Sequence, residues 1–130
     1  MTQANQKLLV LEDHPGLGSL MKDLFGSRGF DVTLCTNGVQ GLEAAETGGY
    51  SAIISDIKMP QMDGIDFLKA LQANPPKVKN GPIIMYSNFA YQYSQDEVIS
   101  LGAADFIAKD TISTGELVER VEALIAKANN

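Results

Sequence analysis

Short apolar runs alternate with amphipathic segments along the whole chain. The first run, KLLVLED, precedes a segment in which Leu, Met and Phe recur at helical spacing, and the same order then repeats to the end of the chain. We therefore expect five strands, each followed by a helix. The strands are expected at residues 7–13, 30–35, 51–56, 81–87 and 104–109, and the helices at 15–29, 37–49, 64–73, 94–102 and from 113 onward.

The expected helices carry local start and stop signals. Ser113 and Glu116 have the spacing of a capping box at the start of the last helix, and Asp63 precedes the third helix as a cap. Paired glycines at 48–49 are a typical stop for the second helix. The Pro-rich stretch at 74–82 lies between two expected elements, so we interpret it as a loop and not as a domain linker.

The alternation of strands and helices predicts an α/β fold. Right-handed crossovers between parallel strands place helices on both faces of one sheet, which gives a doubly wound, five-stranded architecture with five helices. Continuous apolar strands such as AIIS and PIIM fit such a sheet, because a strand covered on both faces need not alternate. The 130 residues suffice for one such domain, with a polar N-terminal tail of about residues 1–6.

Composition narrows the classes of function. The net charge of −6 repels nucleic acid phosphates, and the ten Lys and Arg residues form no cluster along the sequence, so we expect no direct nucleic acid binding. One cysteine and one histidine cannot make a disulfide framework or a zinc site, and we expect Cys35 to be a buried strand residue. The polar N-terminus resembles neither a signal peptide nor a membrane span, which favours a cytoplasmic protein without membrane insertion.

Polar side chains stand at the ends of four of the five expected strands. They are Glu12 and Asp13 after the first strand, Asp56 after the third, Ser87 after the fourth and Lys109 after the fifth. The carboxyl ends of parallel strands meet at one edge of a sheet, so we expect these side chains to converge. Crowded carboxylates without His or Cys favour Mg²⁺, which in turn favours phosphate chemistry. Asp56 would then accept a phosphoryl group, while Lys109 and Ser87 stabilise its oxygens.

Simpler roles are open for these residues one at a time. Asp56 alone resembles a turn residue, and Lys109 alone resembles a solvated surface lysine. Glu12 and Asp13 are candidate caps for the helix that follows them. His14 lies beside these acids, but loop histidines are common, and contact with a ligand is the lesser alternative. The agreement of four strand ends is what favours a functional site.

Four parts of the sequence carry a family resemblance: LEDHPG after the first strand, DIKMPQMDG after the third, Ser87 after the fourth, and GAADFIAK leading to Lys109. Over nearly its whole length the chain resembles a response regulator receiver domain of two-component and phosphorelay systems, and it is similar in size and layout to single-domain chemotaxis regulators. The resemblance implies a flavodoxin-like sheet of strand order 2-1-3-4-5. It also implies a signalling protein that receives phosphate from a histidine kinase or a histidine phosphotransfer protein.

The resemblance assigns roles to the acids of the site. It implies that Asp56 is the phosphoacceptor and a ligand of Mg²⁺, that Asp13 is a direct ligand, and that Glu12 is a ligand through water. The backbone carbonyl of Lys58 would complete the protein's share of the metal site. By the same resemblance, the chain would catalyse its own phosphorylation and a slow autodephosphorylation.

The resemblance also implies a switch. Ser87 and Lys109 would bind the phosphoryl oxygens, and Phe106 matches the family's switch aromatic. Movement of Phe106 would bias the face formed by the fourth helix, fifth strand and fifth helix, where a downstream protein partner binds. Phe106 is equally a candidate core residue of its strand, and both roles can hold at once. Receivers often pair through the helices of this face, so a weak homodimer is open.

The chain departs from the family pattern beside two site residues. Asp110 stands where receivers usually have proline, often after a cis peptide, so the peptide from Lys109 is either a strained cis bond or trans. Asp110 also adds a carboxylate that is able to pair with Lys109 and compete with phosphate. Asn88 and Phe89 border the family's path for the attacking water, and we expect the bulky Phe89 to slow hydrolysis of the phosphoaspartate.

Aromatic residues crowd the stretch NFAYQYS at 88–94. Phe89, Tyr91 and Tyr93 fit a partner-binding surface, because aromatic side chains anchor interfaces. They fit local packing over the fourth strand equally well, and both interpretations stay open.

Three other functions compete with a phosphorylated receiver. A phosphorylation-independent adaptor on the same fold is favoured if Asp110 and Asn88 weaken the switch. A phosphatase of the haloacid dehalogenase type also uses an Asp nucleophile after a strand, but it requires a second Asp two positions later, where this chain has Lys58. A flavodoxin cradles phosphate in its first loop, where Glu12 and Asp13 repel it.

Overall fold

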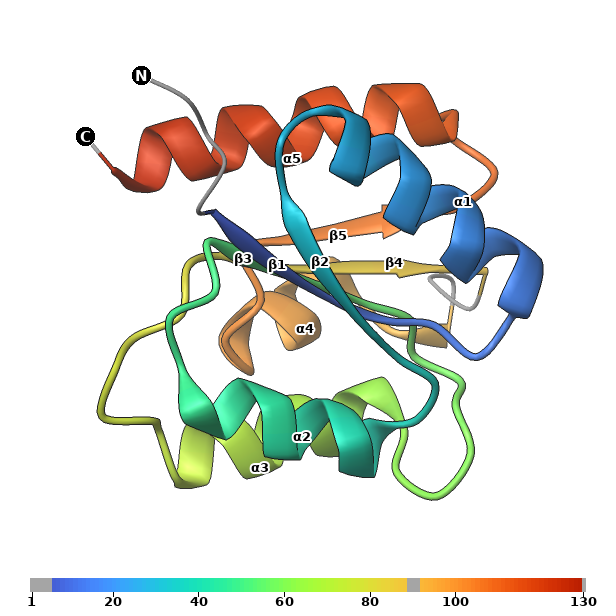
Figure 1. Ribbon diagram of the computed structural model, residues 1–130. Coiled ribbons are helices and arrows are strands. Elements are labelled where there is room, and N and C mark those ends of the chain that lie inside the picture. The colour runs from blue at the N-terminus through green and yellow to red at the C-terminus, as the bar shows by residue number, and fades with distance from the viewer. Residues whose placement is uncertain (1–5, 89–91, 130) are drawn as a thin grey trace.

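The computed structural model describes residues 6–88 and 92–129 and shows a parallel five-stranded sheet between two layers of helices (Figure 1). The strand order β2-β1-β3-β4-β5 confirms the expected doubly wound, flavodoxin-like fold. The elements in chain order are β1 (Lys7–Leu11), α1 (Pro15–Ser27), β2 (Asp31–Cys35), α2 (Gly38–Thr47), β3 (Ala52–Ser55), α3 (Gly64–Ala73), β4 (Ile83–Ser87), α4 (Gln95–Ser100), β5 (Asp105–Ala108) and α5 (Thr114–Ala128).

Alternate residues of the strands face two sides of the sheet. Leu8 and Val10 of β1 pack with α1 and α5 on one side, whereas Leu9 and Leu11 pack with α2 and α3 on the other. Figure 1 shows α1 and α5 together above the sheet and α2, α3 and α4 below it. The sheet is therefore buried on both faces, as its continuous apolar strands predict.

Local signals set several helix ends as expected. The Asp63 side chain accepts a hydrogen bond from the Asp66 backbone N–H at 2.8 Å, which makes Asp63 the cap of α3. Ser113 and Glu116 form the expected reciprocal capping box at the start of α5. Both contacts satisfy backbone donors that the first turn of a helix leaves without partners.

The expected helix at 94–102 was too long at both ends. Ser94 lies outside the helix as its N-cap, and α4 itself covers only Gln95–Ser100. Gly102 has a φ of 112°, a left-handed conformation that favours glycine and ends the helix before it. No helix in the described part of the chain has the length and hydropathy needed to cross a membrane.

The start of α3 packs directly against the strand end that carries Asp56. A Cβ atom added at Gly64 would overlap the backbone carbonyl oxygen of Asp56 and would lie 2.8 Å from Met85 Cε. The Gly64 N–H also donates to the Ile57 carbonyl oxygen at 2.7 Å. The absence of a side chain at Gly64 thus lets the helix hold the loop that follows Asp56.

We expect Gly64→Ala to lower the free energy of unfolding by about 1–3 kcal/mol, because the added methyl group overpacks a buried backbone contact. Denaturation followed by circular dichroism measures the change. Gly26→Ala in α1 is the matched control, since its Cβ meets nothing within 4 Å and alanine is favoured over glycine inside a helix. Unchanged or higher stability of Gly64→Ala would show that the contact relaxes without cost.

Candidate functional site

The structure brings the strand-end residues together at the carboxyl edge of the sheet. The backbone hydrogen bonds between neighbouring strands continue into this edge. The Asp56 N–H donates to the Leu11 carbonyl at 3.0 Å, and the Lys109 N–H donates to the Ser87 carbonyl at 3.1 Å. The residues so placed are Glu12, Asp13, Asp56, Ser87 and Lys109. Parallel strands thus deliver the expected set of side chains to one place.

A buried ammonium joins two of the strand ends. Lys109 Nζ donates to Glu12 Oε1 and to Asp56 Oδ2, each at 2.8 Å. The three side chains are 9%, 2% and 7% exposed, respectively. Backbone N–H groups bind the other carboxylate oxygens, since Ile57 donates to Asp56 Oδ1 at 2.7 Å and His14 donates to Glu12 Oε2 at 3.1 Å. Each oxygen of these two buried acids therefore has a donor, as buried charge requires.

Burial and pairing act in opposite directions on the pKa values of this group. Burial lowers the pKa of Lys109, but the hydrogen bonds and charges of Asp56 and Glu12 together outweigh burial and raise that pKa above its ordinary value. Burial raises the pKa of Glu12, and the contacts with Lys109 and the His14 N–H offset only part of the rise. Lys109 is therefore charged at neutral pH, while Glu12 is a weaker acid than an exposed glutamate.

Three carboxylates lie close enough to hold one cation. One carboxylate oxygen from each of Glu12, Asp13 and Asp56 lies within 4.8 Å of the other two. Against the single ammonium of Lys109 these acids leave an excess of two negative charges, which a divalent cation neutralises. Oxygen donors without His or Cys suit Mg²⁺. The residues present therefore fit a magnesium ion.

The alternative in which Glu12 and Asp13 cap the next helix is not supported. The N-cap position of α1 belongs to His14, which has no side-chain capping bond among the described residues, and Pro15 begins the helix. His14 is exposed, and its contact with a ligand stays the lesser alternative. The expectation that Cys35 is a buried strand residue is confirmed.

Ser87 and Phe106 lie on adjoining strands beside this group. Ser87 is fully buried at the end of β4, and the backbone hydrogen bond holds it beside Lys109. Phe106 is partly buried and packs on the apolar cluster that α3 and α4 form against the sheet. The core role of Phe106 is therefore confirmed in part, and its switch role stays a prediction. Lys58 is exposed in the loop after Asp56, and metal binding by its carbonyl also stays a prediction.

Sequence patterns do not reveal two contacts of the site. One is the ion pair between Glu12 and Lys109; the binding of metal by Glu12 through water, which the family resemblance implies, stays a prediction. The patterns also pass over Tyr86, whose ring centroid lies 5.8 Å from Lys109 Nζ, within the range of a cation–π contact. Tyr86 is buried, and burial raises the pKa of its phenol despite the nearby Lys109. The one feature of the sequence that places Tyr86 near the site is that it directly precedes Ser87.

The departures from the family pattern lie at the rim of the site. The Lys109–Asp110 peptide is trans, and the Asp110 side chain is exposed. Asn88 is exposed at the end of β4. Phe89 and Tyr91 lie outside the described residues, so the expected screening of water by Phe89 stays a prediction. Tyr93 is half-buried and packs on the α3–α4 cluster, which supports local packing for that aromatic residue.

Comparison with known proteins agrees with this geometry. A sequence model of the response regulator receiver domain matches residues 8–122. The transcriptional activator protein PfeR of Pseudomonas aeruginosa is 31% identical over 121 residues, which are 93% of this chain and 38% of PfeR. The receiver domain of the Francisella response regulator 1452 is 30% identical, with a TM-score of 0.81 over 95% of this chain and 98% of that domain.

A second solved structure contains the ion that the acid cluster fits. The receiver domain of the sensor histidine kinase PA1611 from Pseudomonas aeruginosa has a magnesium ion coordinated in its active site cleft. It is 29% identical to this chain, with a TM-score of 0.79 over 95% of this chain and 99% of that domain. The resemblance thus extends to a domain whose active site cleft holds a magnesium ion.

This chain belongs to the response regulator receiver domain family of two-component systems. It spans about half the length, or less, of the curated relatives it matches. Receiver domains bind Mg²⁺ in an acidic pocket, and the group of Glu12, Asp13 and Asp56 forms such a pocket here.

We expect Asp13→Asn to weaken Mg²⁺ binding by about tenfold or more, because the cluster loses one of its three ligand charges. Titration with Mg²⁺, followed by amide NMR shifts around the site, measures the dissociation constant. Asp23→Asn on the exposed face of α1 is the matched control, since it removes the same charge away from the cluster. Equal weakening in both variants would mean that overall charge, and not this cluster, attracts the ion.

Proposed function

We propose that this chain is a phosphorylatable receiver, which accepts a phosphoryl group on Asp56 from a histidine kinase or a histidine phosphotransfer protein. The observation that carries the proposal is the position of the Asp56 carboxylate, held by the Lys109 ammonium and the Ile57 N–H beside two further acids. A nucleophilic carboxylate, a fixed ammonium and an oxygen-lined cation site are the parts that phosphoryl transfer to aspartate requires.

The transfer would proceed by substitution at phosphorus. An Asp56 carboxylate oxygen forms a bond to phosphorus as the P–N bond to the donor's imidazole breaks, and the imidazole leaves with that electron pair and takes up a proton. Lys109 exchanges its hydrogen bond to Asp56 for one to a phosphoryl oxygen, and the Ser87 hydroxyl binds another. Mg²⁺, when bound by the acid cluster and the Lys58 carbonyl, supplies positive charge against these oxygens. Slow hydrolysis of the phosphoaspartate returns the chain to its starting state.

A downstream protein partner would sense the change on the face made by α4, β5 and α5. Ser87 adjoins the acceptor site, and Phe106 packs on the cluster beneath α4. Arg120 Nη1 on α5 bonds to Asp105 Oδ2 on β5 at 2.7 Å, so these two elements are joined on the same face. Movement of Ser87 toward a phosphoryl oxygen, followed by Phe106, would shift the population of two packings of this face.

We expect wild-type protein, incubated with a small acyl phosphate donor and Mg²⁺, to gain one phosphoryl group by intact mass spectrometry. Asp56→Asn should gain none, because it lacks the acceptor carboxylate, and EDTA should abolish the gain in the wild type. Asp66→Asn, an exposed position in α3, is the matched control and should behave as the wild type.

A different result identifies the second candidate function. If wild-type protein binds Mg²⁺ but gains no mass from the donor, the phosphorylation-independent adaptor takes precedence. Asp110, which stands where receivers usually have proline, is the observation that favours this candidate. A gain of mass in Asp56→Asn equal to that of the wild type would place the modification elsewhere and contradict the assignment of Asp56.

We expect Tyr86 to act as a positioning residue for Lys109 through the face of its ring. Tyr86→Leu should slow phosphorylation by roughly three- to tenfold, the range of a partly desolvated cation–π contact, whereas Tyr86→Phe should keep the wild-type rate. Intact mass against time gives the rates, and denaturation shows whether each variant is folded. Equal slowing in both variants would assign the effect to the hydroxyl and not to the ring.

A further inference from the structure

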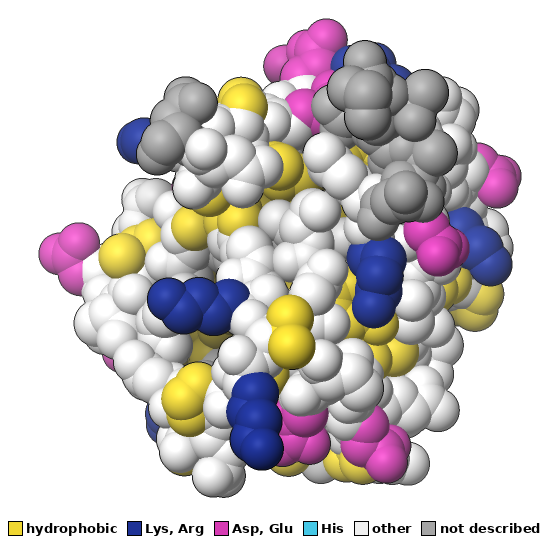
Figure 2. All heavy atoms as spheres, turned by 60° about the vertical axis from the view of Figure 1, so that its left-hand side comes forward, with side chains coloured by type: hydrophobic (Ala, Val, Ile, Leu, Met, Phe, Trp, Pro, Cys, Tyr) yellow, Lys and Arg dark blue, Asp and Glu magenta, His cyan; other side chains and the backbone are white. Residues whose placement is uncertain are grey.

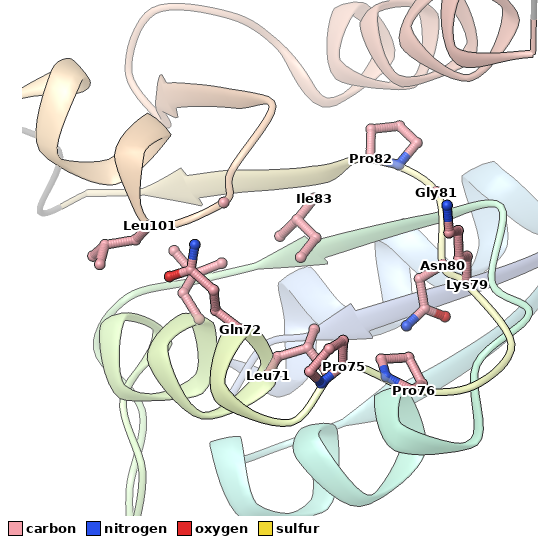
Figure 3. Close-up of a pocket in the computed structure, with 12 residues that line it drawn as sticks. Leu71, Gln72, Pro75, Pro76, Lys79, Asn80, Gly81, Pro82, Ile83 and Leu101 are labelled. Carbon is pink, nitrogen blue, oxygen red and sulfur yellow. The ribbon is translucent and has the colours of Figure 1, made fainter.

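An apolar groove lies at the opposite edge of the sheet from Asp56, where the strands begin. It has a volume of about 510 Å³, and the end of α3, the 74–82 loop, the start of β4 and the turn after α4 form its walls (Figure 3). Its apolar lining includes Leu68, Leu71, Pro75, Pro76, Ile83 and Leu101. Figure 3 shows Ile83 between Leu101 on one side and Lys79 on the other. A groove of this size and apolar lining is typical of binding sites.

The loop that forms one wall is held from the side of α2 and β3. Asn80 Oδ1 accepts the Tyr50 N–H at 3.1 Å, and Asn80 Nδ2 donates to the Ala45 carbonyl at 2.9 Å. A Cβ atom at Gly48 would overlap the Val78 carbonyl oxygen, so the loop backbone packs directly on the end of α2. The groove is therefore preformed, and an occupant need not order this wall when it binds.

Positive charge borders the groove in a protein whose net charge is −6. Lys79 lines the groove and Lys77 precedes it in the same loop; both are exposed, and neither joins an ion pair within the described ranges. Val78 between them is 59% exposed, more than any other large hydrophobic side chain of the described residues. Figure 2, which views the side of the molecule that bears this loop, shows lysine and arginine side chains across the face, with many acidic side chains nearer its rim.

We propose that this groove docks an acidic segment of a partner protein, which inserts a bulky apolar side chain between α3 and the 74–82 loop. The apolar lining takes up the inserted side chain, and its burial supplies most of the affinity. Lys77 and Lys79 pair with carboxylates that flank the anchor and fix its direction. Elsewhere the excess of acidic side chains repels the same segment, which confines it to this face.

A protein segment fits these features better than a membrane surface does. Leu68 and Leu71 in the lining are buried, so a flat bilayer surface does not reach them, whereas a single inserted side chain can. The docking site lies at the opposite edge of the sheet from Asp56, so the proposal goes beyond phosphorylation and does not depend on it.

The test is an NMR titration of the full chain with a short synthetic peptide of Glu, Asp, Leu and Phe. We expect amide shifts confined to the groove segments, around residues 68–83 and 101–104. A matched peptide with Ser in place of every Leu and Phe should bind at least about tenfold more weakly, because it retains the charges but lacks the anchor. Lys77→Glu and Lys79→Glu should each raise the dissociation constant by roughly fivefold or more, because the new carboxylate repels the carboxylates of the peptide.

Lys22→Glu on the exposed face of α1 is the matched charge reversal, and it should change the dissociation constant by less than about twofold. Equal weakening by Lys22→Glu and Lys79→Glu, or equal binding of the Ser peptide, would reduce the effect to general charge attraction and overturn the proposal. Shifts outside the groove segments would also overturn it. Binding to phosphatidylglycerol vesicles that requires Lys77 and Lys79, without binding of the peptide, would assign the face to a membrane instead.

Discussion

The arrangement of the site depends on one ammonium group shared between two carboxylates. Lys109 follows β5, yet it binds Glu12 after β1 and Asp56 after β3, so it joins strand ends that are distant in the sequence. These groups are almost fully enclosed, and loss of one partner from such a buried group costs roughly 3–5 kcal/mol. The same pairing leaves an excess of negative charge, so the arrangement that joins these three side chains also favours the binding of a cation.

Much of the fold follows from signals that act over a few residues. The period of apolar residues defines each strand and helix, and a cap such as Asp63 or Ser113 acts within one helical turn. Parallel strand order then brings the strand ends to one edge, which is why the acids, Ser87 and Lys109 were predictable as a group. The ends of α4 were predicted less well, because Ser94 and Gly102 both fit a helical pattern although they lie outside the helix.

The pairings inside the site were beyond these local signals. Glu12 and Lys109 are 97 positions apart, and neither residue's neighbours indicate which of several nearby groups it will bind. The apolar pattern of the fourth strand predicts Tyr86 only as a core residue, and the fold alone places Lys109 against its ring. The groove is similar in kind, since the pattern of residues 68–83 and that of the turn after α4 are explained separately by core packing and by a Pro-rich loop, and only the fold brings them together. The depth of the groove and the convergence of the site residues arise only when the chain folds.

The lysines of the 74–82 loop are exposed, but the backbone around them is not free. A protease must draw an extended stretch of chain into its active site, so an accessible side chain does not make a cleavage site. Because Asn80 holds this loop to Tyr50, two residues before β3 begins, the loop separates only when that corner of the domain opens. Tryptic cleavage after Lys77 or Lys79 would therefore report local unfolding at the edge of the sheet where the strands begin. The native sequence already contains both cleavage positions.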